Sequence, residues 1–233
     1  RCLTPQRSEE YQRAIFLVGD SQAATLVPAF ERALQGRKRF AWLSREGCAY
    51  LADEDLGTCQ LQSLETATDF RNAVSAVLKD NVQEGDVVAL ISEGRLHLSA
   101  ATLNLYRWLA DTIINPRGAT LLLLGSIPRL LLQVPALCRS TFWNLNAHSR
   151  CEQPFAQAQS PHTENRPAMA NALATSMERV IFLDLFVLFC EPGRGVCGGM
   201  VPGTSTLAYA DKLHLSRAGS YYLSPYLCPI LNP

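Results

Sequence analysis

The sequence has no excess of charge of either sign, because lysine plus arginine and aspartate plus glutamate each total 21 among its 233 residues. A chain with no net charge has no overall field that would draw it onto nucleic acid or an anionic membrane surface. We therefore expect no nucleic-acid partner.

Long hydrophobic runs are also missing. The longest apolar stretches, Ala119–Leu124 and Val180–Cys190, are shorter than the ~18 residues that a transmembrane helix needs. The chain begins at Arg1 and shows no signal-peptide pattern, which fits a mature form or a domain taken from a longer protein.

Metal-binding patterns are absent as well. None of the eight cysteines forms a C-x-x-C unit and the four histidines are scattered, so we expect neither a metal site nor a cofactor. An even number of widely spaced cysteines favours disulfides formed in an oxidising compartment. We therefore expect an extracytoplasmic chain, which is secreted, periplasmic, or the lumenal or extracellular domain of a membrane protein.

The sequence does contain an alternation of strand and helix patterns. Runs of consecutive apolar residues predict strands at Ala14–Val18, Phe40–Leu43, Val87–Ile91, Thr120–Leu124 and Val180–Leu185. Helical spacing predicts helices at Ala23–Leu34, Leu64–Leu78, Ala100–Ile114, Ala168–Met177 and Ser216–Leu227. This order predicts one α/β domain over residues 1–233, with a three-layer α/β/α, doubly wound, flavodoxin-like parallel sheet of about five strands.

Ser21 follows the first predicted strand in the turn Gly19-Asp20-Ser21, just before the first predicted helix. Ligand sites of doubly wound sheets lie beyond the carboxyl ends of the strands, and a hydroxyl at a helix N-terminus is close to N–H groups that stabilise an oxyanion. The position therefore suits a nucleophile, and it equally suits a serine that only caps the helix.

Asp211 and His214 form a second candidate unit. They are three residues apart in the segment between the last strand and the last helix, which the topology returns to the end of the first strand. A carboxylate there can bind one imidazole nitrogen while the other nitrogen faces a serine, the arrangement that activates a hydroxyl.

Two sequence blocks carry a resemblance to a known family. The block Phe16-Leu17-Val18-Gly19-Asp20-Ser21-Gln22-Ala23 resembles the nucleophile block of SGNH (GDSL-like) hydrolases, and Asp211-Lys212-Leu213-His214-Leu215-Ser216 with Gly219 resembles their last block. Three further features are most similar to the SGNH domain fused to acyltransferase-3 membrane proteins that O-acetylate surface polysaccharides: Leu215-Ser216 after the histidine, Gly47-Cys48, and the Cys190/Cys197 spacing.

The resemblance implies a role for each matching residue. Ser21 would be the nucleophile, His214 the general base and acid, and Asp211 the residue that orients His214. The backbone N–H groups of Ser21 and Gly47 would bind the oxyanion. Many family members carry Gly-x-Asn-Asp in a third block, where this chain has Ser92-Glu93-Gly94-Arg95. We therefore expect an oxyanion hole with two donors, or one assisted by Arg95.

The resemblance also implies the activity. It indicates a serine O-acyl esterase or acyltransferase that acts, as an O-acetyl enzyme, on hydroxyls of a cell-surface or secreted polysaccharide through an acyl-serine intermediate. Its partners would be a carbohydrate acceptor, an acyl donor, and an N-terminal membrane acyltransferase portion of the same protein. One alternative is a polysaccharide O-acetyl esterase with related blocks, although those usually have Trp where this chain has Leu215. The other alternative is a catalytically silent glycan-binding module on the same fold.

The irregular stretch Pro128–Pro167 is too long for an ordinary connection. We expect it to be an insertion that borders the acceptor site, with Trp143 as a candidate for stacking on a sugar ring. Trp42 and Trp108 lie inside apolar patterns, so we expect them in the core.

The eight cysteines predict four disulfides. Neighbours along the chain give Cys48–Cys59, Cys138–Cys151 and Cys190–Cys197, and elimination leaves Cys2–Cys228. Closing loops of roughly 10–15 residues stabilises a fold by about 3 kcal/mol in the chain-entropy model.

Overall fold

The central sheet has five parallel strands in the order β2-β1-β3-β4-β6. The computed structural model describes residues 13–36, 38–46, 50, 64–91, 100–131, 138, 151–158, 178–191 and 193–232. The strands are β1 Ala14–Gly19, β2 Arg39–Ser44, β3 Val87–Ile91, β4 Thr120–Leu124 and β6 Val180–Leu183. The α/β fold with a doubly wound parallel sheet is therefore confirmed.

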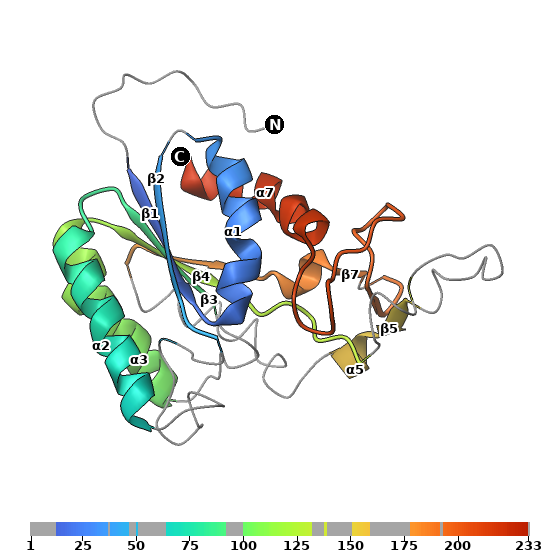
Figure 1. Ribbon diagram of the computed structural model, residues 1–233, viewed down its shortest axis with the longest axis horizontal. Helices are drawn as coiled ribbons and strands as arrows, with labels where there is room; N and C mark the ends of the chain where they lie inside the picture. Colours follow the sequence, from blue (N-terminus) through green and yellow to red (C-terminus); the bar gives the residue numbers. More distant parts are fainter. Residues whose placement is uncertain are drawn as a thin grey trace.

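Helices cover both faces of this sheet (Figure 1). The cores place α1 (Ser21–Leu34) and α7 (Arg217–Leu231) on one face, and α2 (Leu64–Asn81) and α3 (Ala100–Leu109) on the other. Alternate residues of a strand point to opposite faces. Accordingly Ile15 and Leu17 of β1 belong to the core under α1 and α7, and Phe16 and Val18 belong to the core under α2 and α3.

Position within the sheet decides how deeply each strand is buried. Every residue of β1 and β3 is buried, as the continuous apolar runs predict, whereas β2 and β6 form the edges and are partly exposed. Trp42 on β2 is 52% exposed and Trp108 on α3 is 37% exposed. The expectation that both tryptophans lie in the core is wrong. For Trp42 the reason is that an apolar pattern does not tell an edge strand from a central strand.

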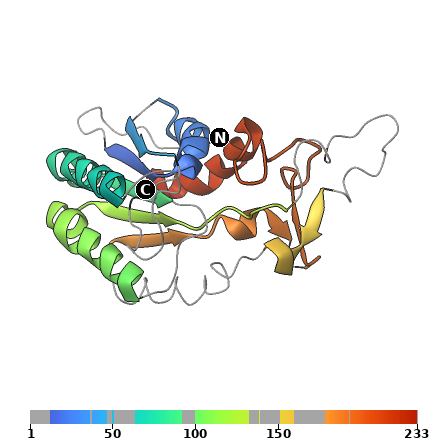
Figure 2. The same ribbon diagram turned by 60° about the horizontal axis from the view of Figure 1, so that its bottom comes forward.

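A second, smaller sheet was not predicted. It is antiparallel, has the order β5-β8-β7, and consists of β5 Glu152–Pro154, β7 Cys190–Glu191 and β8 Val196–Gly198. Figure 2 shows it at one end of the molecule, beside the short helix α5 (Phe155–Ala158) and beyond the ends of β4 and β6. Strands of two or three residues carry no periodicity that a sequence pattern could reveal.

Disulfides fasten this small sheet. Cys138 is bonded to Cys151, immediately before β5, and Cys190 of β7 is bonded to Cys197 of β8. These are two of the four pairs that the sequence predicts. Cys228 is also disulfide-bonded, while Cys2, Cys48 and Cys59 lie outside the described residues, as does the predicted helix Ala168–Met177.

Helices α1 and α7 are packed closely. Pro28 lies inside α1, where a proline disturbs the hydrogen-bond ladder, and the Ala29 N–H donates to the buried Ser220 Oγ at 2.9 Å. A Cβ on Gly219 would lie 2.0 Å from the Ala208 carbonyl oxygen, so this position requires glycine. These contacts fix the start of α7 beside α1. None of the described helices has the length and apolarity to cross a membrane.

Candidate active site

Ser21 is the first residue of α1, and only Asp20 separates it from the end of β1 at Gly19. The turn is tight, because a Cβ on Gly19 would lie 2.0 Å from the Ile91 carbonyl oxygen. Asp20 caps the helix: its Oδ1 accepts from the Gln22 N–H at 2.9 Å and its carbonyl oxygen accepts from the Ala23 N–H at 3.1 Å. The cap is therefore Asp20, and the Ser21 hydroxyl is available for another contact.

That contact is with His214. The Ser21 Oγ lies 2.8 Å from His214 Nε2, and His214 Nδ1 lies 2.7 Å from Asp211 Oδ2. These three side chains are called here the Ser-His-Asp row, and its members Ser21 and His214 are 193 residues apart in the chain. The His214 side chain is 30% exposed, so a substrate can approach the row from solvent.

Asp211 also shapes its own turn. Its Oδ1 accepts from the N–H groups of Leu213 at 2.7 Å and His214 at 2.8 Å. Partial burial acts to raise the pKa of the Asp211 carboxyl, but the hydrogen bonds from these two residues outweigh burial and lower that pKa. The carboxylate is thus kept ionised beside the imidazole.

Backbone hydrogen bonds hold the 211–214 turn at its two ends. The Ala210 N–H donates to the His214 carbonyl oxygen at 2.8 Å, and Tyr209 and Leu215 form an antiparallel bridge. Outside the turn, the Leu130 N–H donates to the Lys212 carbonyl oxygen at 2.9 Å. Local sequence thus makes the turn, and a distant segment anchors it.

The arrangement is suited to activating the serine hydroxyl. Nε2 can take the Oγ proton while the carboxylate stabilises the imidazolium that forms. The first N–H groups of a helix have no acceptor inside the helix. Since the Asp20 cap takes those of Gln22 and Ala23, the Ser21 N–H is the one suited to binding an oxyanion.

The other residues that the sequence singles out lie outside the described part of the chain. They are Gly47, Arg95 and Trp143. The described chain does bring the end of β2 to this site, because the Arg45 N–H donates to the Gly19 carbonyl oxygen at 3.2 Å. Gly47 follows only two residues later in the sequence.

Two residues near the site were not anticipated from the sequence. Leu130 and Gln153 are both buried, and together they connect the small sheet to the 211–214 turn. A glutamine on a three-residue strand and a leucine two residues after a proline have no distinguishing signal in the sequence. Only their spatial contacts reveal them.

A cavity of about 440 Å³ lies beside the small sheet. Its lining includes Phe189, Arg194 and Met200 but none of the Ser-His-Asp row, so we assign it no part in the chemistry. Within the described ranges, no cluster of three or more histidine, cysteine or acidic side chains could hold a metal ion.

Comparison with known proteins identifies related sequences and folds. Residues 1–229 match the family described as "SGNH domain (fused to AT3 domains)". No curated protein matches the sequence significantly.

Several solved structures share the fold, and two of them are enzymes or enzyme domains. The periplasmic domain of a lipopolysaccharide acetyltransferase from Salmonella ser. Paratyphi A superposes with a TM-score of 0.64 at 14% identity, covering 95% of this chain and 84% of that one. A carbohydrate esterase family 2 enzyme with a carbohydrate-binding domain, from Corynascus thermopiles (Myceliophthora fergusii), gives 0.52 at 14% identity and covers 97% and 67%. At these identities the likeness establishes the fold.

Proposed function

Because the chain belongs to the family of SGNH domains fused to AT3 domains and is a domain of the SGNH esterase and acyltransferase type, we propose that it moves O-acetyl groups on the hydroxyls of a cell-surface or secreted polysaccharide. The observation that carries this proposal is the Ser-His-Asp row, with 2.8 Å and 2.7 Å between its polar atoms. The lipopolysaccharide acetyltransferase and the carbohydrate esterase that share the fold support a carbohydrate as the substrate class.

In the first half of the reaction, Ser21 Oγ attacks the carbonyl carbon of the acyl donor while its proton passes to His214 Nε2. The carbonyl oxygen becomes an oxyanion. As the tetrahedral intermediate collapses, the bond from the acyl carbon to the leaving oxygen breaks, and that oxygen takes the proton from Nε2. Ser21 is then acylated.

In the second half, a hydroxyl of water or sugar gives its proton to Nε2 and attacks the acyl carbon. The bond to Ser21 Oγ breaks, and Oγ recovers the proton from Nε2. Water as the acceptor gives hydrolysis, and a sugar hydroxyl gives transfer. Ser21 and His214 perform the same steps in hydrolysis and in transfer.

The oxyanion is bound by the Ser21 N–H at the start of α1, helped by the helix dipole. The Gly47 N–H is the second donor in this proposal, and Arg95 is a further candidate. Removing one such donor typically lowers kcat by about 100–1000-fold.

The family and the disulfides support an extracytoplasmic setting. Cys138–Cys151 and Cys190–Cys197 favour an extracytoplasmic location, where thiols are oxidised. An AT3 portion of the same protein, in the membrane, would supply the acyl group to Ser21, and the polysaccharide would receive it.

The test uses p-nitrophenyl acetate with the wild-type domain and the Ser21→Ala variant. We expect wild-type turnover, and a fall of more than about 10,000-fold in kcat/KM for the variant, because the three residues act as a unit. A fluorophosphonate probe should label Ser21 and no other serine. Ser224→Ala is the matched control, because that serine is buried in α7 and its hydroxyl donates to the Tyr221 carbonyl oxygen at 2.8 Å.

Three outcomes decide between the functions. Turnover that depends on Ser21 supports the proposal, and acetyl transfer to a polysaccharide in place of water distinguishes the transferase from a polysaccharide O-acetyl esterase. Wild-type activity in Ser21→Ala, or labelling of another serine, contradicts the assigned nucleophile. No turnover together with binding to an immobilised glycan favours the glycan-binding module.

A further inference from the structure

We propose that Gln153 is a positioning residue of the active site, which holds the 211–214 turn in place through the segment 129–131. The effect that we expect on kcat rests on the proposed function, whereas the effect that we expect on the hydrogen exchange of the turn does not. The chain of contacts runs from the small sheet through a buried amide to the backbone between Asp211 and His214.

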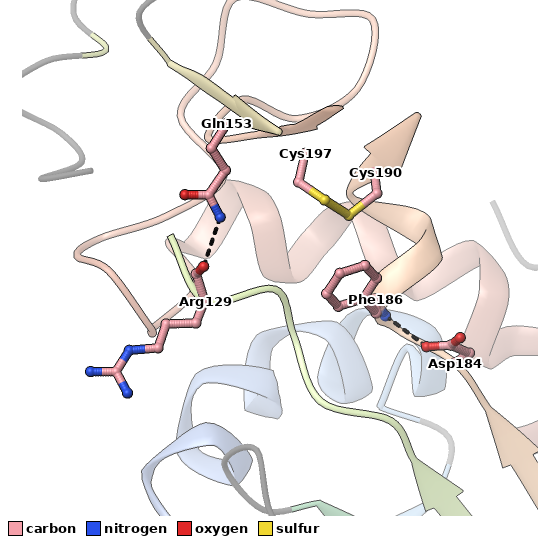
Figure 3. Close-up of a disulfide and its surroundings, with 6 residues drawn as sticks. All are labelled: Arg129, Gln153, Asp184, Phe186, Cys190 and Cys197. Carbon is pink, nitrogen blue, oxygen red and sulfur yellow. Dashed lines mark hydrogen bonds between the residues drawn. A yellow bond between two sulfur atoms is a disulfide. The ribbon is translucent and has the colours of Figure 1, made fainter. Parts of the chain in front are cut away.

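Gln153 uses both ends of its side-chain amide on one segment. Its Nε2 donates to the Arg129 carbonyl oxygen at 2.8 Å, and its Oε1 accepts from the Leu131 N–H at 2.8 Å. Figure 3 shows the first of these bonds, with the Gln153 side chain reaching from β5 to the backbone of Arg129. Gln153 is 3% exposed, so water does not compete for these bonds.

Leu130 lies between Arg129 and Leu131 and binds the 211–214 turn of the active site. Leu130 is fully buried, and its N–H donates to the Lys212 carbonyl oxygen at 2.9 Å. Asp211 and Lys212 are themselves exposed, so little packing holds them. Among the backbone hydrogen bonds of the described residues, this is the one that reaches 211–213 from outside the turn.

Two disulfides constrain the strand that carries Gln153. Gln153 is paired with Cys197 of β8, and Cys197 is bonded to Cys190 of β7. Two residues before Gln153, Cys151 is bonded to Cys138. The two disulfides therefore hold in place the small sheet that carries Gln153, whose side-chain amide binds segment 129–131.

Glutamine is needed here because an amide both donates and accepts. An apolar side chain of the same length would leave the Arg129 carbonyl and the Leu131 N–H without these partners, and buried unpaired groups drive a backbone to rearrange. A shift of about 1 Å in a positioning element can cost about a hundredfold in rate.

The experiment compares Gln153→Met with Glu152→Gln. Methionine keeps the length and removes both hydrogen bonds. The control changes the adjacent residue of β5, whose side chain points to the other face of the strand and binds Arg194 at 2.9 Å. On p-nitrophenyl acetate we expect Gln153→Met to lower kcat by about 10–100-fold with KM within about twofold, and the control to behave as wild type.

Hydrogen exchange supplies a readout that does not require activity. We expect the backbone amides of 208–216 to exchange about tenfold faster in Gln153→Met than in wild type, with those of β1 and β3 unchanged. If the wild-type domain shows no esterase activity, the proposed function fails. The hydrogen-exchange comparison then still tests whether Gln153 holds the 211–214 turn. Unchanged exchange at 208–216, or equal acceleration in Glu152→Gln, overturns the inference.

Gln153→Glu is a second variant, which covers the case that Gln153→Met does not fold. Its oxygen still accepts from Leu131, but an ionised carboxylate repels the Arg129 carbonyl, and a protonated one donates to it. Burial favours the protonated form as the pH is lowered. We therefore expect faster exchange at 208–216 than wild type at pH 7 and convergence with wild type near pH 5. Exchange equal to wild type at both pH values contradicts the role of Gln153.

Discussion

Asp211 makes three hydrogen bonds with its two carboxylate oxygens, so it acts on the turn and on His214 at the same time. Oδ1 closes the turn by accepting two backbone N–H groups, and Oδ2 faces His214 Nδ1. A side chain with a single acceptor can serve only one of these functions. The same carboxylate thus folds the turn and orients the imidazole.

We expect Asp211→Asn to lower kcat by about 100–10,000-fold, less than Ser21→Ala or His214→Ala. If the amide oxygen closes the turn, the amide NH₂ faces Nδ1, which favours the tautomer with the proton on Nε2. That tautomer cannot accept the Ser21 proton. Steady-state kinetics on p-nitrophenyl acetate check this, and an Asn variant as active as wild type would contradict the orienting role.

The lowered pKa of Asp211 also predicts how stability depends on pH. An unfolded aspartate has a pKa of about 3.9, so a lower pKa in the fold means that these hydrogen bonds stabilise the protein fully above about pH 5. That stabilisation is lost as the pH falls through the lowered pKa. We expect wild type to have the higher Tm at neutral pH and its advantage over Asp211→Asn to shrink below about pH 4. A Tm difference between wild type and Asp211→Asn that widens as the pH falls would contradict a lowered pKa of Asp211.

At the scale of elements, helices α1 and α7 present the two halves of the Ser-His-Asp row to each other. Ser21 begins α1, and His214 precedes α7, whose N-cap Ser216 Oγ accepts from the Gly219 N–H at 3.1 Å. The close approach at Gly219 keeps the start of α7 against Ala208. The packing of two helices therefore sets the distance from Oγ to Nε2.

Gly219→Ala tests this packing. A methyl group has no room beside the Ala208 carbonyl, so we expect a loss of stability of about 1–3 kcal/mol, which is a fall in Tm of about 2–12 °C. Gly193→Ala is the control, because nothing lies within 4 Å of a Cβ there. Thermal unfolding measures both variants, and equal Tm values for the two would mean that the helices adjust without cost.

At the scale of the whole molecule, a small sheet is added to a parallel sheet at the end where the active site forms. The insertion predicted around 128–167 contributes β5 to that sheet, and it begins with the segment that contacts Lys212. The part closed by the Cys138–Cys151 disulfide can be changed separately, because the two Cα atoms are 4.8 Å apart.

We expect replacement of residues 139–150 by a short glycine-serine linker to leave p-nitrophenyl acetate hydrolysis unchanged and to abolish action on polysaccharide. The disulfide keeps Cys151 in place, so Gln153 and segment 129–131 are undisturbed. Trp143→Ala should weaken polysaccharide action alone if that residue stacks on a sugar. Full activity of the shortened protein on polysaccharide would show that this loop does not contact the acceptor.

The sequence by itself determined the parallel sheet, because consecutive apolar residues such as Val87–Ile91 have few alternatives to a strand buried on both faces. It also indicated the members of the Ser-His-Asp row, because a serine between a strand and a helix and the three-residue spacing of Asp211 and His214 are local features of the sequence. Edge and centre strands were not distinguishable, and Trp42 was placed wrongly for that reason.

Only the tertiary structure decided which segments meet. The contact of Ser21 with His214 depends on α1 lying against α7, and the anchoring of Lys212 depends on Leu130 and Gln153. Hydrogen bonds between backbone groups do not depend on the type of side chain, so no sequence pattern predicts them. The platform of β5, β7 and β8 exists because three very short strands pair and two disulfides hold them, and that is a property of the folded arrangement.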